Sequence, residues 1–349
     1  MALEQDMLRR ASAYPGTLTY IDLIRKNKRA STMLIGAMIL LGVVLGALIA
    51  ALLTTQFGAT AEDLIPSAIL GGAVALGIAL IGTLWSWYGG GSAILAMAGA
   101  RPLAREEDPV LHNVVEELAI AGGVPMPRVY LIEDSAMNAF ATGRDPRHGA
   151  VAITRGLREK LTRDELQGVM AHELAHIRHL DIRFAMLMAT MVGLIVFACD
   201  AFWRVLRHGR WMRISGGGRA SMGRSSSGGK GGGGAAIVML VLFVIAIVLA
   251  ILAPIIARFI QMAYSRQREY LADAGAVELT RNPLGLASAL QKLAHDDEPL
   301  VDGANRGTAH LYIVNPLRAM RESHQSINSM FLSHPPIKER IARLMALSR

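Results

Sequence analysis

The stretch His172-Glu173-Leu174-Ala175-His176 decides both the fold and the chemistry of this chain. Residues four positions apart lie on one face of an α-helix, so the two imidazoles can reach one metal ion. Glu173 lies one position further round, beside the open side of that metal. A catalytic zinc ion takes three protein ligands and keeps a fourth position for a water whose pKa falls to about 7. The third ligand must therefore come from elsewhere in the chain.

A polar run downstream of a long apolar segment supplies the best candidate for this ligand, Glu269. Asp273 follows one helical turn later on the same face, where its carboxylate can accept the second ring N–H of a ligating histidine. The alternative interpretation is an ordinary solvated helix face shared with Arg266 and Arg268.

Histidines on a helix do not always bind metal, because a pair at i and i+4 can also cap or line an ordinary helix. His179 adds a third histidine, but it lies about 10 Å along the axis from His172, whereas zinc ligands lie about 2 Å from the metal. We therefore expect His179 to be a polar surface or interfacial residue.

The composition is too apolar for an ordinary soluble enzyme, since 52% of the 349 residues are hydrophobic and only 18% are charged. Residues 33–53 and 67–88 carry no charge, and each segment is long enough to cross about 30 Å of hydrocarbon. The polar stretch 1–32 precedes them, so we expect an uncleaved anchor with a cytoplasmic juxtamembrane segment.

Two further apolar segments, residues 184–203 and 235–257, flank the chemistry. Since His176 and Glu269 must reach the same ion, the chain between them crosses the bilayer twice or not at all. The loop 204–234 has six arginines, one lysine and no acidic residue, and its Gly/Ser tract predicts a disordered loop that prefers the cytoplasm. A hairpin that does not cross, a crossing despite the charge and an exceptional topology stay open; segment length favours the crossing pair.

Residues 101–182 indicate a compact α+β unit. Asp108 before a proline is an N-cap and predicts a helix to about residue 121. Short strands are expected at residues 128–132, 138–142 and 150–154. Thr162 begins a capping box at the start of the metal-binding helix. We expect this helix to run to about Leu180 and on into the third apolar segment, which would hold the metal close to the membrane.

These patterns resemble HtpX-type membrane zinc metalloproteases, in the peptidase family that includes the CAAX prenyl proteases. The resemblance covers nearly the whole chain. It implies a mainly helical α+β fold, with a membrane-anchored gluzincin-like domain, four apolar helices and a small mixed or antiparallel sheet. The motifs that carry it are residues 20–29, the Asn138-Ala139-Phe140-Ala141-Thr142-Gly143 run, the metal-binding helix, the Glu269 region and His334-Pro335-Pro336.

The residues and the resemblance together give a site with one Zn²⁺ per chain. His172, His176 and Glu269 are the expected ligands, and Asp273 is expected to bond one ligating histidine. Glu173 would take the proton of the attacking water and pass it to the leaving amine.

Two other regions gain a role from the resemblance alone. His334 and Arg340 would face the cleft and stabilise the oxyanion, a contribution of about 3 kcal/mol for one good donor. Tyr264 and Tyr270 are alternative donors. Without the resemblance, His334 is a loop residue and Arg340 a surface charge. An edge strand, otherwise an ordinary half-buried one, would pair with extended peptides through Asn138, Ala139, Phe140 and Ala141.

The resemblance implies a multi-pass protease of the bacterial cytoplasmic membrane that cleaves unfolded or damaged membrane proteins, and the basic residues before the first span predict that its protease domain faces the cytoplasm. Its basic residues cluster beside apolar segments, which favours lipid headgroups over nucleic acid. The single cysteine, Cys199, allows no intrachain disulfide. The alternatives are a prenyl-peptide processing protease and a zinc-binding or zinc-transporting protein without enzymatic activity. The oligomeric state stays open. The expected segments are 1–32, the two spans in 33–88, the first protease part at 101–182, two apolar helices in 183–263 and the second protease part at 264–349.

Overall fold

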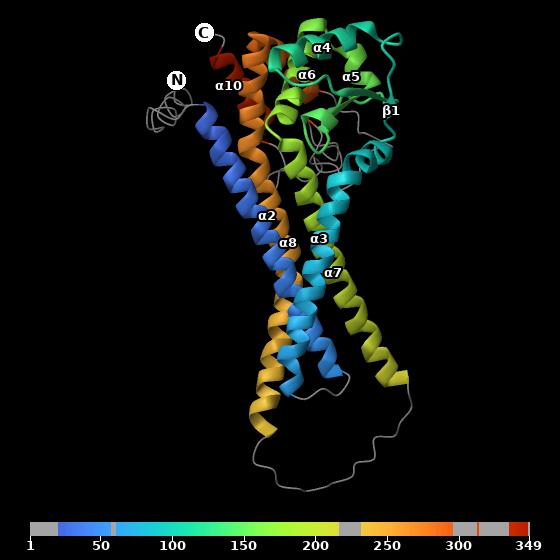
Figure 1. The fold of residues 1–349 in the computed structure, drawn as a ribbon, viewed down its shortest axis with the longest axis vertical. Helices are drawn as coiled ribbons and strands as arrows, with labels where there is room; N and C mark the ends of the chain where they lie inside the picture. The colour runs from blue at the N-terminus through green and yellow to red at the C-terminus, as the bar shows by residue number, and fades with distance from the viewer. Residues whose placement is uncertain (1–19, 57–60, 216–231, 296–312, 314–334, 348–349) are drawn as a thin grey trace.

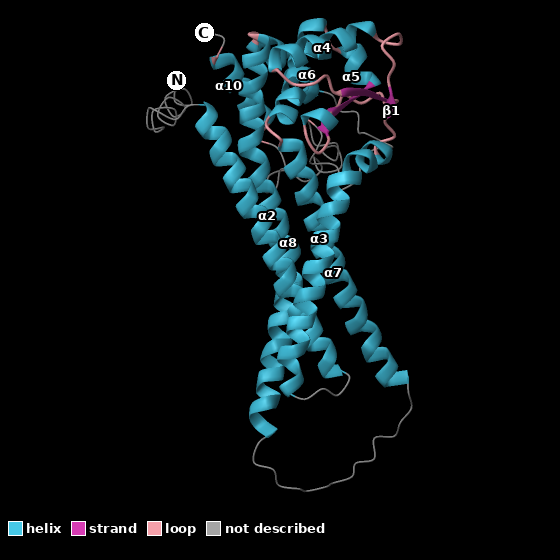
Figure 2. Cartoon of the chain, in the orientation of Figure 1, coloured by secondary structure: helices cyan, strands magenta, loops and turns pink. Residues whose placement is uncertain are grey.

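The computed structural model describes residues 20–56, 61–215, 232–295, 313 and 335–347. Four long helices form a stalk, and the other described elements, apart from a short 3-10 helix at Ala61–Asp63, gather into a head at one end of it (Figure 1). All four strands lie in the head (Figure 2).

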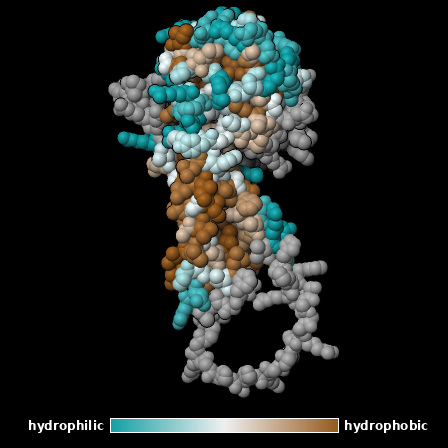
Figure 3. Space-filling model, turned by 45° about the vertical axis from the view of Figure 1, so that its right-hand side comes forward, coloured by the Kyte–Doolittle hydropathy of each residue, from teal (hydrophilic) through white to brown (hydrophobic). Residues whose placement is uncertain are grey.

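The stalk helices are α2 (Tyr20–Gln56), α3 (Leu64–Met97), α7 (Asp181–Ser215) and α8 (Gly232–Thr280). Each contains a segment long and apolar enough to cross a membrane, which confirms the four expected apolar helices. These segments are Thr32–Thr54, Leu64–Met97, Asp181–Arg204 and Phe243–Ile260. Figure 3 shows apolar side chains gathered over the face of the stalk that is turned to the viewer, below the head.

The connection between α7 and α8 is shorter than the sequence suggested. Helix α7 continues to Ser215 and α8 already begins at Gly232, so much of the loop expected at 204–234 is helical. The rest of that loop lies outside the described residues.

Helices α2 and α3 are joined through the short 3-10 helix η1 (Ala61–Asp63) and approach closely at two glycines. A Cβ atom on Gly71 would lie 2.2 Å from the Cβ atom of Ala50 and 2.6 Å from the carbonyl oxygen of Gly46. Small residues at such positions let two membrane helices bring their backbones together.

The head contains a mixed sheet of β1 (Arg101–Pro102), β2 (Arg128–Ile132), β3 (Ala139–Thr142) and β4 (Ala150–Thr154), in the order β1-β2-β4-β3. Strands β2 and β4 run parallel, and the other two pairs are antiparallel. The three expected strands are confirmed, and the two-residue β1 is too short to have shown a period. The 3-10 helix η2 (Pro146–His148) connects β3 to β4.

Five helices complete the head: α4 (Pro109–Gly122), α5 (Arg155–Lys160), α6 (Arg163–Arg178), α9 (Pro283–His295) and α10 (Ile337–Ala346). Helix α4 begins as predicted, because the Asp108 side chain accepts from the Leu111 N–H at 3.0 Å. The apolar faces of α4, α6 and α9 and of the sheet share one buried core, including Leu111, Leu166 and Leu290. Helix α6 lies at its centre, so its side chains are held rigidly.

Helix α6 starts with the predicted capping box of Thr162 and Glu165, but the expected continuation into the third apolar segment is wrong. Leu180 has a left-handed backbone with φ 64°, which ends α6 before α7 begins at Asp181. A non-glycine residue in this conformation is uncommon, so the sequence alone did not signal the break.

Candidate metal centre

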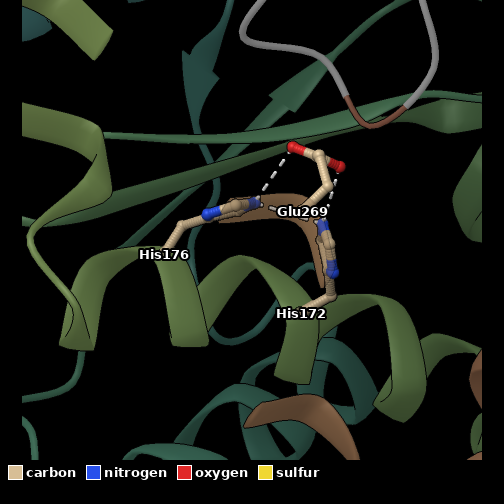
Figure 4. Close-up of side chains that lie close together, drawn as sticks. All are labelled: His172, His176 and Glu269. Carbon is tan, nitrogen blue, oxygen red and sulfur yellow. Dashed lines mark hydrogen bonds and ion pairs between the residues drawn. The ribbon is translucent and has the colours of Figure 1, made fainter. Parts of the chain in front are cut away.

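Helices α6 and α8 bring three potential metal ligands together (Figure 4). The Nε2 atoms of His172 and His176 lie 3.2 Å apart. Glu269 comes from the head end of α8, with Oε2 3.6 Å from Nε2 of His172 and Oε1 3.6 Å from Nε2 of His176. The two histidines that share a face of α6 and the distant carboxylate of Glu269 therefore lie together, as the sequence predicts.

This donor set fits a zinc ion. A tetrahedral zinc with bonds of about 2.0 to 2.1 Å places neighbouring donor atoms about 3.4 Å apart. The three separations, 3.2, 3.6 and 3.6 Å, lie on either side of that value. Two imidazoles with one carboxylate are also a typical ligand set for catalytic zinc.

Each histidine has an aspartate on its other ring nitrogen. Asp273 Oδ1 lies 3.0 Å from Nδ1 of His172, the position that the sequence suggested for this carboxylate. Asp181 Oδ2 lies 3.0 Å from Nδ1 of His176. Because both Nδ1 atoms have carboxylate partners, both Nε2 lone pairs are free to face the metal position. Sequence analysis missed Asp181, since its contact depends on the break at Leu180.

Each aspartate is in turn paired with a buried arginine. Arg340 is fully buried and forms a bidentate pair with Asp273, at 3.0 Å from Nε and 2.7 Å from Nη2. Its third nitrogen, Nη1, lies 3.1 Å from Oε2 of Glu269. Arg268 pairs with Asp181. The contacts of Arg340 favour a role in holding two carboxylates over the oxyanion role suggested by the resemblance.

Burial sets the protonation state of the centre. Burial lowers the pKa of His172 to about 4, assisted by the charge of Arg340. Burial also lowers the pKa of His176 to about 4, against the opposing effect of Glu269. Burial opposes ionisation of Asp273 as well, but Arg340 outweighs it and lowers the pKa of that carboxyl. Neutral imidazoles beside ionised carboxylates are the forms that metal binding needs.

Glu173 is buried next to this group. Burial, followed by the negative charge of Glu269, raises the pKa of Glu173 to about 8. Its carboxylate accepts a hydrogen bond from the backbone N–H of Ala141 on β3. A pKa near neutrality suits a side chain that takes up and releases a proton during a reaction.

Strand β3 forms one edge of the sheet and packs against α6, next to Glu173. The backbone N–H of Ile313, from a distant part of the chain, donates to the carbonyl oxygen of Ala139 at 2.9 Å. The carbonyl oxygen of Ile313 accepts in turn from Nη1 of Arg340 at 3.4 Å. The outer edge of β3 therefore already accepts a second main chain. Asn138 and Phe140 are buried with Ala139 and Ala141.

The other suggested site residues lie as follows. His334 and the side chain of Tyr264 lie outside the described residues. Tyr270 hydrogen-bonds with Glu339, so its hydroxyl faces α10. Burial and this hydrogen bond raise the pKa of Tyr270 to about 12. The expectation for His179 is wrong: it caps the C-terminus of α6 and is only 3% exposed.

A head with this centre on four apolar helices defines a membrane-associated metallopeptidase. A profile described as peptidase family M48 matches residues 105–348. The chain therefore belongs to peptidase family M48 and is a zinc metallopeptidase. This membership excludes the alternative of a zinc-binding protein without enzymatic activity.

Bacterial relatives match over most of their length. The protease HtpX homologue of Dictyoglomus turgidum is 41% identical over 78% of this chain and 80% of its own. The homologue of Syntrophobacter fumaroxidans is 42% identical over 78% of this chain and 89% of its own. That of Listeria monocytogenes serotype 4a is 46% identical over 72% of this chain and 79% of its own. The crystal structure of S. mikatae Ste24p covers 93% of this chain and 67% of its own, with a TM-score of 0.48 and 22% identity.

Proposed function

We propose that this chain is an endopeptidase that holds zinc with His172, His176 and Glu269 and cleaves unfolded or damaged membrane proteins. The observation that carries the proposal is the meeting of three donor atoms within 4.8 Å of one another. Glu173 lies beside them, buried and with a raised pKa.

The side chains divide the chemistry among them. A bound zinc ion would acidify its water and polarise the scissile carbonyl. Glu173 accepts the proton of the attacking water and transfers it to the nitrogen of the leaving amine. Asp273 and Asp181 keep each ring proton on Nδ1, and Arg340 holds the carboxylates of Asp273 and Glu269 in place.

An extended peptide is the substrate form that suits β3. The edge of a sheet recognises another main chain through N–H and C=O groups, so pairing depends little on side chains. The carbonyl oxygen of Ala139 accepts from Ile313, so a substrate strand would replace that segment at Ala139 or pair further along β3. An unfolded segment of a damaged protein can adopt that form, whereas a folded domain cannot.

The charge near the head end of α2 favours a cytoplasmic head. Arg25, Lys26, Lys28 and Arg29 lie in the part of this helix that precedes its apolar segment. Positive residues prefer the cytoplasmic side, and the first span usually dominates orientation. We therefore propose that the centre faces the cytoplasm of a bacterium, and that α7 and α8 cross the membrane despite the basic residues between them.

Digestion of unfolded casein by the detergent-purified chain, with and without a chelator, tests this function. We expect cleavage that the chelator abolishes. Glu173→Gln should retain zinc and lose at least about 100-fold in rate, while Glu269→Ala should lose zinc. Asp164→Asn, an exposed change on the same helix, serves as the control. Zinc-loaded protein that leaves casein intact, or an active Glu173→Gln variant, would contradict the proposal; preference for a prenylated peptide would favour the processing alternative.

A further inference from the structure

We infer that Asp181 and Arg268 are positioning residues for His176, and that the left-handed break at Leu180 is what brings them to it. The inference rests on the proposed zinc site and adds to it a connection between the metal centre and a membrane helix. It is carried by helix geometry, by a buried hydrogen bond and a buried ion pair of Asp181, and by the arrangement of α6, α7 and α8.

The break at Leu180 is necessary for the contact between Asp181 and His176. In an unbroken α-helix, a residue five positions on lies about 140° round the axis and faces away. Leu180, with φ 64°, ends that geometry and starts α7 in a new direction. Asp181 thereby returns to 3.0 Å from Nδ1 of His176. Uncommon backbone conformations of this kind persist where the surrounding structure fixes them, and they concentrate at functional sites.

Arg268 holds Asp181 in that position. Both residues are buried, with 5% and 6% of their surfaces exposed, so their ion pair is shielded from water. The guanidinium also lies 5.5 Å from the centre of the Phe184 ring, one turn along α7. A buried carboxylate without a paired charge would be unfavourable, so the Arg268 guanidinium stabilises the Asp181 carboxylate at the position where it accepts the ring N–H.

The two histidines are supported in the same way but from different parts of the molecule. Asp273, the partner of His172, lies on α8 one turn from Glu269, within the head. Asp181, the partner of His176, is the first residue of α7, which enters the stalk. Arg268 directly precedes Glu269 on α8. One ligand is therefore fixed to the point where the head joins a candidate membrane span.

The zinc affinity of the purified full-length chain, measured by competition with a chelator, tests the inference. Removing a hydrogen-bond partner behind a metal ligand typically weakens metal binding 10- to 100-fold. We expect this loss for Asp181→Ala, a smaller loss for Asp181→Asn and a loss of the same direction for Arg268→Gln. Glu278→Ala is the matched control, because its pair with Arg178, at 3.3 Å, also joins α6 and α8 without touching the site.

Leu180 supplies an independent variant that alters no charge. Leu180→Val should weaken zinc binding more than Leu180→Gly, since a β-branched residue resists a positive φ that glycine adopts freely. The visible spectrum of the Co²⁺-substituted protein should change in Asp181→Ala and stay as in the wild type in Glu278→Ala. A purely structural role of Asp181 would instead lower the thermal midpoint of the zinc-free Asp181→Ala protein and leave its Co²⁺ spectrum as in the wild type.

The outcomes separate this inference from the proposed function. A wild-type chain that binds no zinc would overturn the function itself. A wild-type chain that binds zinc, with Asp181→Ala within twofold of it, would overturn the inference alone. If Asp181→Ala does not fold, zinc affinities of Arg268→Gln and Leu180→Val within twofold of wild type would overturn it equally.

Discussion

At the scale of single residues, Arg340 shows how a buried positive charge is stabilised by neighbouring carboxylates. It is fully buried and contacts Asp273, Glu269 and the carbonyl oxygen of Ile313. Removing one partner of a buried ion pair typically costs about 3 to 5 kcal/mol, because the other charge is left without compensation. We expect Arg340→Met to lower the thermal midpoint of the zinc-free protein strongly.

Two further variants make this prediction specific. Asp273→Asn combined with Arg340→Met should restore part of the lost thermal midpoint, since it removes one of the carboxylates that Arg340→Met leaves without a paired charge. Arg343→Met, on the same helix, breaks an exposed pair with Glu339 and should cost about 1 kcal/mol at most. An Arg340→Met protein as stable as Arg343→Met would contradict the account.

The sequence contained part of this site. The spacing of His172 and His176 and the pair Glu269 and Asp273 are periodic features of helices, so their convergence could be predicted. Asp181 could not, because an unbroken helix would place it on the wrong face and a leucine gives no signal of a positive φ. Hydrogen-bond partners that depend on a local break become visible only in three dimensions.

At the scale of elements, Glu165 joins α6 to α9. Its carboxylate accepts from Ser288 at 2.6 Å and from Lys292 at 2.7 Å, as well as closing the capping box. Burial opposes its ionisation, but the hydrogen bonds from Lys292, Ser288 and Thr162 outweigh it and lower the pKa of Glu165 to about 2.

This shift predicts a pH dependence. A lowered pKa in the folded state stabilises the protein above the unfolded value of 4.5 and is lost as the pH falls toward 2. The full effect is about 3 kcal/mol. The difference in thermal midpoint between zinc-free wild type and Glu165→Gln should therefore shrink over that range. Glu159→Gln, an exposed change on α5, serves as the control; a constant difference for Glu165→Gln would contradict the assignment.

The contact between α2 and α3 gives a second prediction at this scale. Gly71→Ala should lower the thermal midpoint in detergent, because its new methyl group would overlap Ala50 and the backbone of Gly46, and overpacking typically costs about 1 to 3 kcal/mol. Gly77→Ala, on the same helix with nothing within 4 Å, is the control and should be neutral. Equal midpoints for the two variants would show that the helices do not pack closely there.

At the scale of the whole molecule, the stalk predicts a topology. The C-terminal ends of α2 and α7 and the N-terminal ends of α3 and α8 lie at the end of the stalk away from the head (Figure 1). In a Cys199→Ser background, Glu62→Cys and Arg207→Cys should react with a membrane-impermeant maleimide added to spheroplasts, whose cytoplasmic membrane is intact. Arg343→Cys should react only after the membrane is disrupted. Labelling of Glu62→Cys without Arg207→Cys would favour the hairpin that does not cross.

The apolar segments were predictable because span length is a property of composition, and so were three strands and the helix after Asp108. The length of α7 was not, since the basic Gly/Ser tract 204–234 has the composition of a loop, yet helix persists to Ser215. The order of the strands also required the structure, because no short sequence period records which strand lies at an edge.

One continuous helix, α8, carries both an apolar segment at Phe243–Ile260 and the carboxylate of Glu269. Glu269 lies nine positions after Ile260 along the helix, a rise of about 14 Å. Lipids of different chain length change the tilt of such a helix, and a rigid helix would transmit that tilt to the carboxylate of Glu269. We therefore expect zinc to dissociate faster from the protein in thin vesicles than in matched thick ones. The enzyme would then sense the thickness of the bilayer that surrounds it.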